Sequence, residues 1–136
     1  MRVVLDTNVL ISGLMYPDST PGMIVRAWRE ARFELLLTVE QLTEIGRVLS
    51  YPKIRKILKW DRATIENFLK QLYLRSELID ISGVAVSVSR DSGDNFILAA
   101  LIVGEAECLV SGDTDLLSLR DRYAVVTPVE FVRRLQ

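Results

Sequence analysis

Short apolar runs alternate along the chain with segments of helical periodicity, and this alternation limits the folds that are open to it. Short strands that are apolar at nearly every position are typical of a parallel sheet covered on both faces. No internal repeat, linker or low-complexity stretch interrupts the alternation. We therefore predict a single domain over residues 1–136, a three-layer α/β/α sandwich with a central, mostly parallel sheet of about five strands. The predicted strands are residues 3–5, 34–37, 78–81, 108–110 and 124–126.

Helix start signals fall between these strands. Ser19-Thr20-Pro21 places proline at the first helical position, and Thr38-Val39-Glu40-Gln41 has the spacing of a capping box. Asp61 precedes the most amphipathic segment, whose apolar stripe runs from Ile65 to Tyr73. Residues 96–103 are apolar on all sides and predict a buried helix. The predicted helices begin at or near Thr20, Val39, Arg62, Phe96 and Pro128.

The residue types that are missing exclude several kinds of chemistry. Histidine is absent, and Cys108 is the only cysteine. This excludes histidine general bases, Ser–His and Cys–His nucleophile pairs, and zinc held by imidazole or by a cysteine cage. Catalysis by this chain must therefore rest on carboxylates, hydroxyls, amines or a metal held by oxygen.

Charge and hydropathy bear on partners and location. The 17 basic and 18 acidic residues give a net charge of −1, which argues against a general nucleic-acid coat protein. No apolar stretch approaches the roughly 20 residues that span a bilayer, and the N-terminal segment does not read as a signal peptide. We expect a cytoplasmic protein with no membrane association.

Acidic residues follow two of the predicted strands directly. Asp6 comes after the first strand, and Ser111-Gly112-Asp113-Thr114-Asp115 comes after the fourth. In parallel α/β sheets ligands gather at the carboxyl ends of the strands, so we expect Asp6 and Asp113 to be metal ligands. A local explanation stays open for each: Asp6 could cap a helix, and the second segment could form a turn and a short capped helix.

Two further acids are candidates by position. Asp94 precedes the predicted buried helix, where a helix dipole would stabilise an acid without any functional role. Glu44 lies at the edge of the apolar face of the helix over residues 39–49, although most single glutamates are simply exposed. Four converging carboxylates need a counter-charge, and Mg²⁺ or Mn²⁺ suits oxygen ligands. Such ions act on phosphate esters, which predicts phosphodiester or phosphomonoester hydrolysis.

The same motifs resemble a known family. LDTNVLISG at the N-terminus, the Glu of TEIGRVL, DNFILAA and LVSGDTDLL look like a PIN domain, in order and over essentially the whole chain. The resemblance is closest to prokaryotic VapC-like toxins of toxin–antitoxin pairs. It implies a Mg²⁺- or Mn²⁺-dependent endoribonuclease that acts on single-stranded or looped RNA, forms a homodimer and is silenced by a small antitoxin protein. The residues it implies are Asp6, Glu44, Asp94 and Asp113 as the catalytic acids, with Asp6, Asp94 and Asp113 on the metal, and Asn8, Ser111 and Asp115 as accessory groups.

Rival functions remain open at this point. A haloacid-dehalogenase-like phosphatase also begins with an acid after the first strand, but it needs a second Asp where this chain has Asn8. A receiver domain needs a Lys at the end of a late strand, which this chain lacks. A non-catalytic PIN-fold module that only binds a partner is the third alternative. The basic residues Lys53, Arg55 and Lys56 are candidate RNA contacts or an ordinary solvated face.

Overall fold

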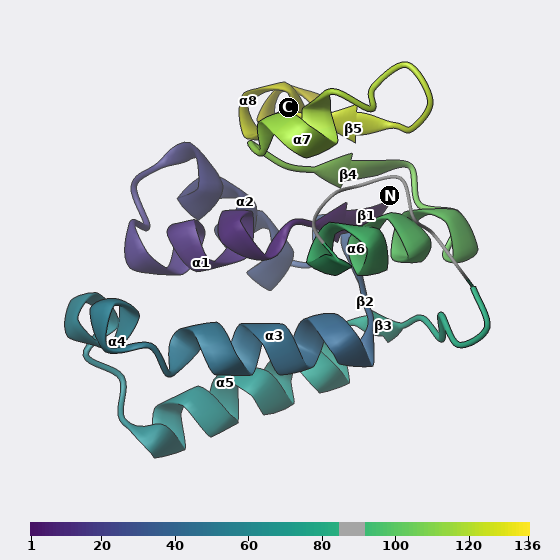
Figure 1. The fold of residues 1–136 in the computed structure, drawn as a ribbon. Helices are drawn as coiled ribbons and strands as arrows, with labels where there is room; N and C mark the ends of the chain where they lie inside the picture. The colour runs from purple at the N-terminus through teal and green to yellow at the C-terminus, as the bar shows by residue number, and fades with distance from the viewer. Residues whose placement is uncertain (85–91) are drawn as a thin grey trace.

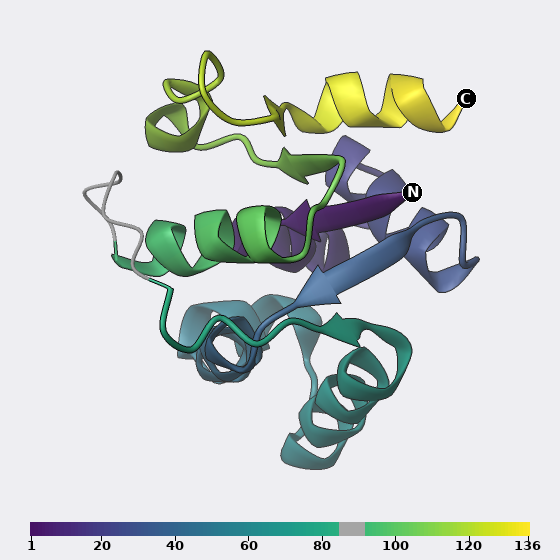
Figure 2. The ribbon, with the colours of Figure 1, turned by 90° about the vertical axis from the view of Figure 1, so that its right-hand side faces the viewer.

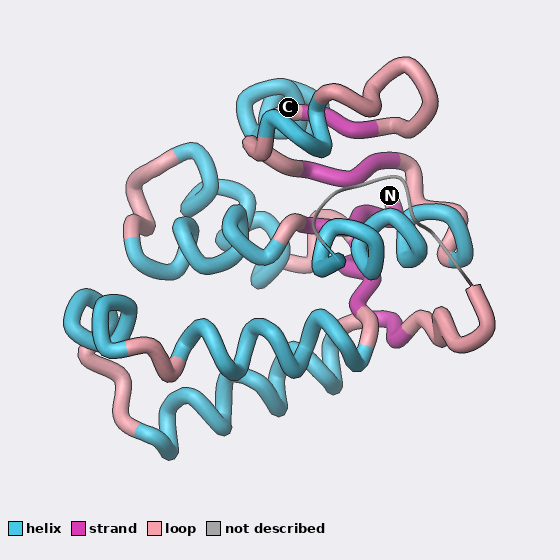
Figure 3. Tube along the Cα trace, in the orientation of Figure 1, coloured by secondary structure: helices cyan, strands magenta, loops and turns pink. Residues whose placement is uncertain are grey.

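The computed structural model describes the backbone of residues 1–84 and 92–136, and the side chains of residues 1–84 and 95–136. Within these residues one sheet lies at the centre and helices pack around it (Figures 1 and 3). The strands are β1 (Arg2–Leu5), β2 (Glu34–Leu37), β3 (Glu77–Leu78), β4 (Cys108–Val110) and β5 (Val125–Val126). The helices are α1 (Thr7–Met15), α2 (Thr20–Arg29), α3 (Val39–Leu49), α4 (Pro52–Leu58), α5 (Arg62–Arg75), α6 (Ser92–Val103), α7 (Thr114–Leu117) and α8 (Pro128–Leu135).

The sheet is parallel throughout, with the strand order β3-β2-β1-β4-β5. In the central strand, Val3 pairs with Leu35 of β2 on one side and with Cys108 of β4 on the other. The chain adds β2 and β3 on one side of β1 and then returns to add β4 and β5 on the other, so the order reverses between β1 and β4. In Figure 2 the arrows of β1 and β2 point left, toward the carboxyl edge of the sheet. Open parallel sheets bind ligands at this edge, beside the reversal.

Side chains of the strands alternate between two cores. Val3 and Leu5 pack on the face that is covered by α1, α2, α3, α5 and α8. Val4, Leu36 and Leu109 pack on the opposite face with residues of α6 and α7. All five of these side chains are almost completely buried, as expected for strands between two helical layers. The predicted three-layer α/β/α sandwich on a parallel sheet is confirmed.

The third strand is shorter than the predicted 78–81. The N–H of Ile79 still donates to the carbonyl of Leu37 in β2, at 2.8 Å. The carboxylate of Asp80 then accepts a hydrogen bond from the backbone N–H of Ser82, at 2.9 Å. Asp side chains that bind the backbone two residues on form a turn, and this turn ends the strand pairing.

Three helices also differ from the prediction. α6 begins at Ser92 rather than near residue 96. The prediction placed the start at the first apolar residue, but the first turn of a helix can be polar because its N–H groups have no partner within the helix. The basic segment forms a helix, α4, that starts at Pro52 and packs Ile54 and Leu58 against the core. Tyr73, predicted on the apolar stripe of α5, is exposed. None of the helices described combines the length and the apolar character that crossing a bilayer requires.

Candidate active site

Asp6 is held at the junction of β1 and α1. Its backbone N–H donates to the carbonyl of Val110 at 2.9 Å, which extends the pairing with β4 by one residue. Its carbonyl accepts from the N–H groups of Val9 and Leu10, which begins α1. Asp6 therefore occupies the N-cap position of α1, where its carboxylate makes no capping hydrogen bond of ordinary geometry, although the N–H of Asn8 in the first turn stabilises its charge. The side chain is only 5% exposed, so the fold buries this carboxylate at the start of the helix.

Ser111 joins the ends of β1 and β4 across the reversal of strand order. Its hydroxyl donates to Oδ2 of Asp6 at 2.7 Å and accepts from the backbone N–H of Asp113 at 2.9 Å. The N–H of Ser111 itself donates to Val126 of β5 at 2.9 Å, and the residue is fully buried. One hydroxyl thus orients the first acid and fixes the loop that carries the second.

The electrostatics around Asp6 oppose its ionisation. Burial is the main cause of a pKa raised above the ordinary aspartate value. The Ser111 hydroxyl and the backbone N–H of Asn8 act in the opposite direction, and the negative charges of Asp113 and Glu44 raise the pKa again. The charged groups that act most on Asp6 are thus both acids, an arrangement that a divalent cation would neutralise.

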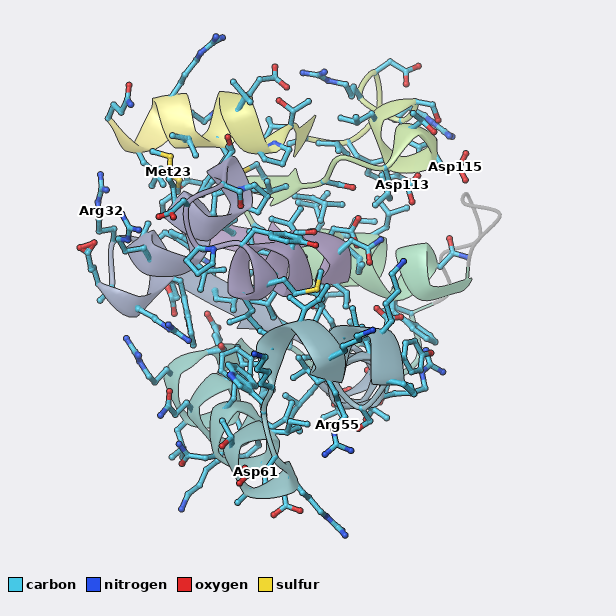
Figure 4. All side chains as sticks on the ribbon, turned by 90° about the vertical axis from the view of Figure 1, so that its left-hand side faces the viewer. Met23, Arg32, Arg55, Asp61, Asp113 and Asp115 are labelled. Carbon is cyan, nitrogen blue, oxygen red and sulfur yellow. The ribbon has the colours of Figure 1, made fainter. Side chains whose placement is uncertain are left out.

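Asp113 and Asp115 follow β4: Asp113 is the N-cap of α7, and Asp115 lies in its first turn (Figure 4). Asp113 caps that helix, because its Oδ1 accepts from the N–H of Asp115 at 2.8 Å. Asp113 therefore does cap a short helix, as the sequence left open. The capping hydrogen bond uses Oδ1 and leaves Oδ2 for another ligand. Asp115 is exposed.

Asp6 and Asp113 share one hollow of about 330 Å³ at the carboxyl edge of the sheet. Asn8, which is exposed, and Gly112 line the same hollow. A Cβ added to Gly112 would meet no atom within 4 Å, so this glycine leaves open space beside the two acids. The hollow can admit a ligand to both carboxylates.

The other predicted residues lie around this centre. Glu44 is half-buried on α3, close enough for its charge to act on Asp6, and it lines a neighbouring hollow. The side chain of Asp94, in the first turn of α6, lies outside the described residues. Within the part of the chain whose side chains are described, no three acids lie close enough together to hold a metal ion by themselves.

The basic residues Lys53, Arg55 and Lys56 are exposed on α4. In Figures 1 and 4 this helix lies well below α7, and Arg55 is far from Asp113 in the view that labels both. Trp60, just after α4, lines a hollow with Gly13 and Leu14 at the far end of α1 from Asp6. The basic residues therefore lie apart from the acids rather than around them.

Gln41 is the site residue that the sequence did not reveal. Its backbone N–H is capped by Thr38, as predicted, but its side chain does not complete a capping box. Instead Nε2 donates to the carbonyl of Leu5 at 2.6 Å and approaches Oγ1 of Thr7 at 3.4 Å, the residues on either side of Asp6. Gln41 is 5% exposed, and its Oε1 has no hydrogen-bond partner among the described atoms. A buried amide thus links the two residues that flank the first acid.

Comparison with known proteins identifies a family. A model of the PIN domain matches residues 2–115, a range that contains all the acids considered above. The whole chain matches 92% of the uncharacterized protein MJ1680 of Methanocaldococcus jannaschii, at 30% identity over 146 aligned positions.

Solved structures share this fold. VapBC2 of Rickettsia felis, bound to a DNA fragment from its promoter, gives a TM-score of 0.58 at 16% identity, covering 93% of this chain and 98% of the other. FitAcB of Neisseria gonorrhoeae gives a TM-score of 0.54 at 18% identity over 93% and 98% of the two chains. At these identities the likeness shows the shared fold. The model of the PIN domain, which spans both strand ends that carry Asp6 and Asp113, shows that the chain belongs to the PIN domain family.

Proposed function

We propose that this protein is a metal-dependent endoribonuclease that hydrolyses RNA phosphodiester bonds. The observation that carries the proposal is the buried Asp6, held by Ser111 beside Asp113, with acids as its strongest charged neighbours. Burying a carboxylate among other carboxylates is costly unless a cation joins them. Membership of the PIN domain family supports the same function.

The chain's own residues divide the work as follows. Asp6 and Asp113, with Asp94 from the start of α6, would hold the ion, and Mg²⁺ or Mn²⁺ fits this all-oxygen donor set. When bound, such an ion supplies Lewis-acid polarisation of a phosphoryl oxygen and acidifies water at neutral pH. Ser111 keeps the Asp6 carboxylate in place, and Gln41 holds the two residues that flank it, through the carbonyl of Leu5 and the hydroxyl of Thr7. Glu44 adds a carboxylate at the rim, where it can accept a proton from water.

The proposed biological role is that of a toxin controlled by a small antitoxin protein. The support is that two of the similar structures, VapBC2 and FitAcB, are assemblies of this kind and match the chain over nearly its full length. We extend the proposal to a homodimer acting in the cytoplasm. Lys53, Arg55 and Lys56, together on the exposed face of α4, would attract the RNA backbone at a distance from the acids.

The test combines cleavage with metal binding. Wild-type protein is incubated with RNA in Mn²⁺, in Mg²⁺ and in EDTA, beside Asp6→Asn, Asp113→Asn and the exposed control Asp18→Asn. We expect cleavage by wild type and Asp18→Asn in either metal, and none in EDTA or in the two site variants. Cleavage that survives Asp6→Asn, or that needs no metal, would contradict the proposal.

Thermal stability gives a readout that does not depend on activity. An ion that binds only the folded state at 100 times its Kd stabilises it by about 2.7 kcal/mol. Mn²⁺ should therefore raise the Tm of wild type and of Asp18→Asn, but not that of Asp6→Asn. A protein that neither cleaves RNA nor responds to metal, and yet binds a partner protein, would instead be a non-catalytic PIN-fold module.

A further inference from the structure

A second hollow opens beside the candidate active site, on the outer face of α3. Its volume is about 360 Å³. Five of its lining residues come from α3 at three- and four-residue spacings, so they share one face of that helix. The lining residues are Val39, Glu40, Thr43, Glu44 and Arg47 of α3 and Phe96 of α6.

Glu44 places this hollow beside the acidic edge. It lines the hollow, and its charge acts on Asp6 at the end of β1. α3 also packs against both α1, which begins after Asp6, and α6, which carries Phe96. A polynucleotide that places a phosphate at Asp6 and Asp113 would therefore pass Glu44 and reach the hollow with an adjacent nucleotide.

The chemistry of the hollow matches a nucleobase. Phe96 is 41% exposed, and Val39 adds a second exposed apolar surface. Glu40 offers hydrogen-bond acceptors and Arg47 offers donors, whereas the Thr43 hydroxyl already donates to the carbonyl of Val39 at 2.9 Å. A base has a π-face for stacking and an edge that carries both donors and acceptors. An apolar peptide side chain would match the ring but leave both charged groups without a partner.

We propose that this hollow is a nucleobase subsite, in which an unpaired base of the substrate stacks on Phe96 with its edge toward Glu40 and Arg47. The inference rests on the proposed ribonuclease function and narrows its substrate. A base inside a duplex cannot present its face to a protein ring, so the RNA must be single-stranded next to the cleaved bond.

The test measures binding of a fluorescein-labelled single-stranded RNA heptamer by fluorescence anisotropy, in the full chain carrying Asp113→Asn to prevent cleavage. Phe96→Ala removes the stacking ring and should raise the Kd about tenfold relative to the chain that keeps Phe96. Phe96→Tyr should keep the Kd within about twofold, since its ring also stacks. The matched control is Ile102→Ala, because Ile102 is a similarly exposed apolar residue of α6, at 45%.

Abasic RNA identifies the stacked base. An abasic position is moved along the heptamer. At one position the missing base should raise the Kd of the chain that keeps Phe96 about tenfold, and adding Phe96→Ala should raise the Kd no further at that position. The inference is overturned if the Kd of Phe96→Ala lies within twofold of that of Ile102→Ala. It is also overturned if Phe96→Ala raises the Kd further at every abasic position. A Tm within a few degrees of wild type confirms that Phe96→Ala folds.

Parallel cleavage assays separate this inference from the function on which it rests. If wild type cleaves RNA and Phe96→Ala binds and cleaves as Ile102→Ala does, the subsite is refuted and the nuclease stands. If wild type binds the heptamer but never cleaves RNA, the nuclease is refuted and the binding data alone decide the subsite. If wild type neither binds nor cleaves RNA, both are refuted.

Discussion

Ser111→Ala tests whether one hydroxyl holds the two halves of the site together. The substitution removes the donor to Asp6 Oδ2 and the acceptor of the Asp113 N–H, at 2.7 and 2.9 Å, from a residue with no exposed surface. A hydrogen bond to a charged group contributes about 1.5–3 kcal/mol to stability, and leaving a polar N–H without its acceptor costs about 1 kcal/mol more. We expect a loss of about 3 kcal/mol in the free energy of unfolding.

The corresponding change in Tm is large enough to measure. For the 136 residues of the chain, an unfolding entropy of about 2.1 cal/mol/K per residue gives about 0.3 kcal/mol/K, so 3 kcal/mol lowers Tm by about 10 °C. The control is Ser118→Ala, whose hydroxyl donates to the carbonyl of Asp115 on the surface, at 2.6 Å. An exposed bond of this kind should cost less than about 0.5 kcal/mol. Both variants are measured in EDTA, by thermal and urea unfolding.

The pH dependence of this loss identifies its cause. The pKa of Asp6 is raised in the folded state, so ionising Asp6 lowers stability as the pH rises from the ordinary aspartate pKa through the folded one. The Ser111 hydroxyl lowers that pKa, so its removal raises the folded pKa further and extends the decline to higher pH. The difference in stability between wild type and Ser111→Ala should therefore grow as the pH rises above the ordinary aspartate pKa. A loss no larger than that of Ser118→Ala, or one that stays constant with pH, would refute the reasoning.

Three further outcomes are expected. Gln41→Met should change the free energy of unfolding by less than about 1 kcal/mol, because the loss of the Nε2 hydrogen bonds is offset by removal of the unpartnered Oε1. The same substitution should reduce RNA cleavage at least tenfold, and unchanged cleavage would exclude a positioning role for Gln41. Phe131→Ala should lower the free energy of unfolding, measured with urea, by about 3–5 kcal/mol, because this fully buried ring packs edge-on against Phe33 with centroids 5.2 Å apart. A loss below about 1 kcal/mol would show that α8 is dispensable to the core. Glu130 has its pKa lowered to about 2, chiefly by the backbone N–H of Thr127 and by Arg120, so its contribution is present above its ordinary pKa and lost as the pH falls toward 2. Glu130→Gln should thus be less stable than wild type at pH 7 and equal to it near pH 2, and a gap that persists in acid would contradict this assignment.

The strand ends were the most predictable part of the molecule. Asp6 and Ser111 follow runs that are apolar at every position, and parallel strands bring their carboxyl ends to one edge whatever their order. The 3.6-residue period of its helix placed Glu44 at the edge of the apolar face of that helix. These inferences need only local patterns and one topological rule.

Features that depend on partners distant in sequence could not be predicted in this way. Gln41 sits three residues after Thr38, where a capping box explains it locally, but its side chain binds Leu5 and Thr7, 36 and 34 positions away. The helix over Pro52–Leu58 was missed because only Ile54 and Leu58 face the core and the basic residues dominate the segment. The strand ending at Leu78 was overextended because the turn made by Asp80 competes with an apolar pattern that favours a strand.

The bond between Ser111 and Asp6 joins residues 105 positions apart. Since β4 and β5 pair only after their residues have been made, a chain that is still emerging from the ribosome carries Asp6 without the strand that completes its surroundings. Asp6 is made well before Asp113 and before the strand that Asp113 follows. For a protein that is proposed to cut RNA, this topology means that the candidate site is completed only after the residues of β4 and β5 have been made.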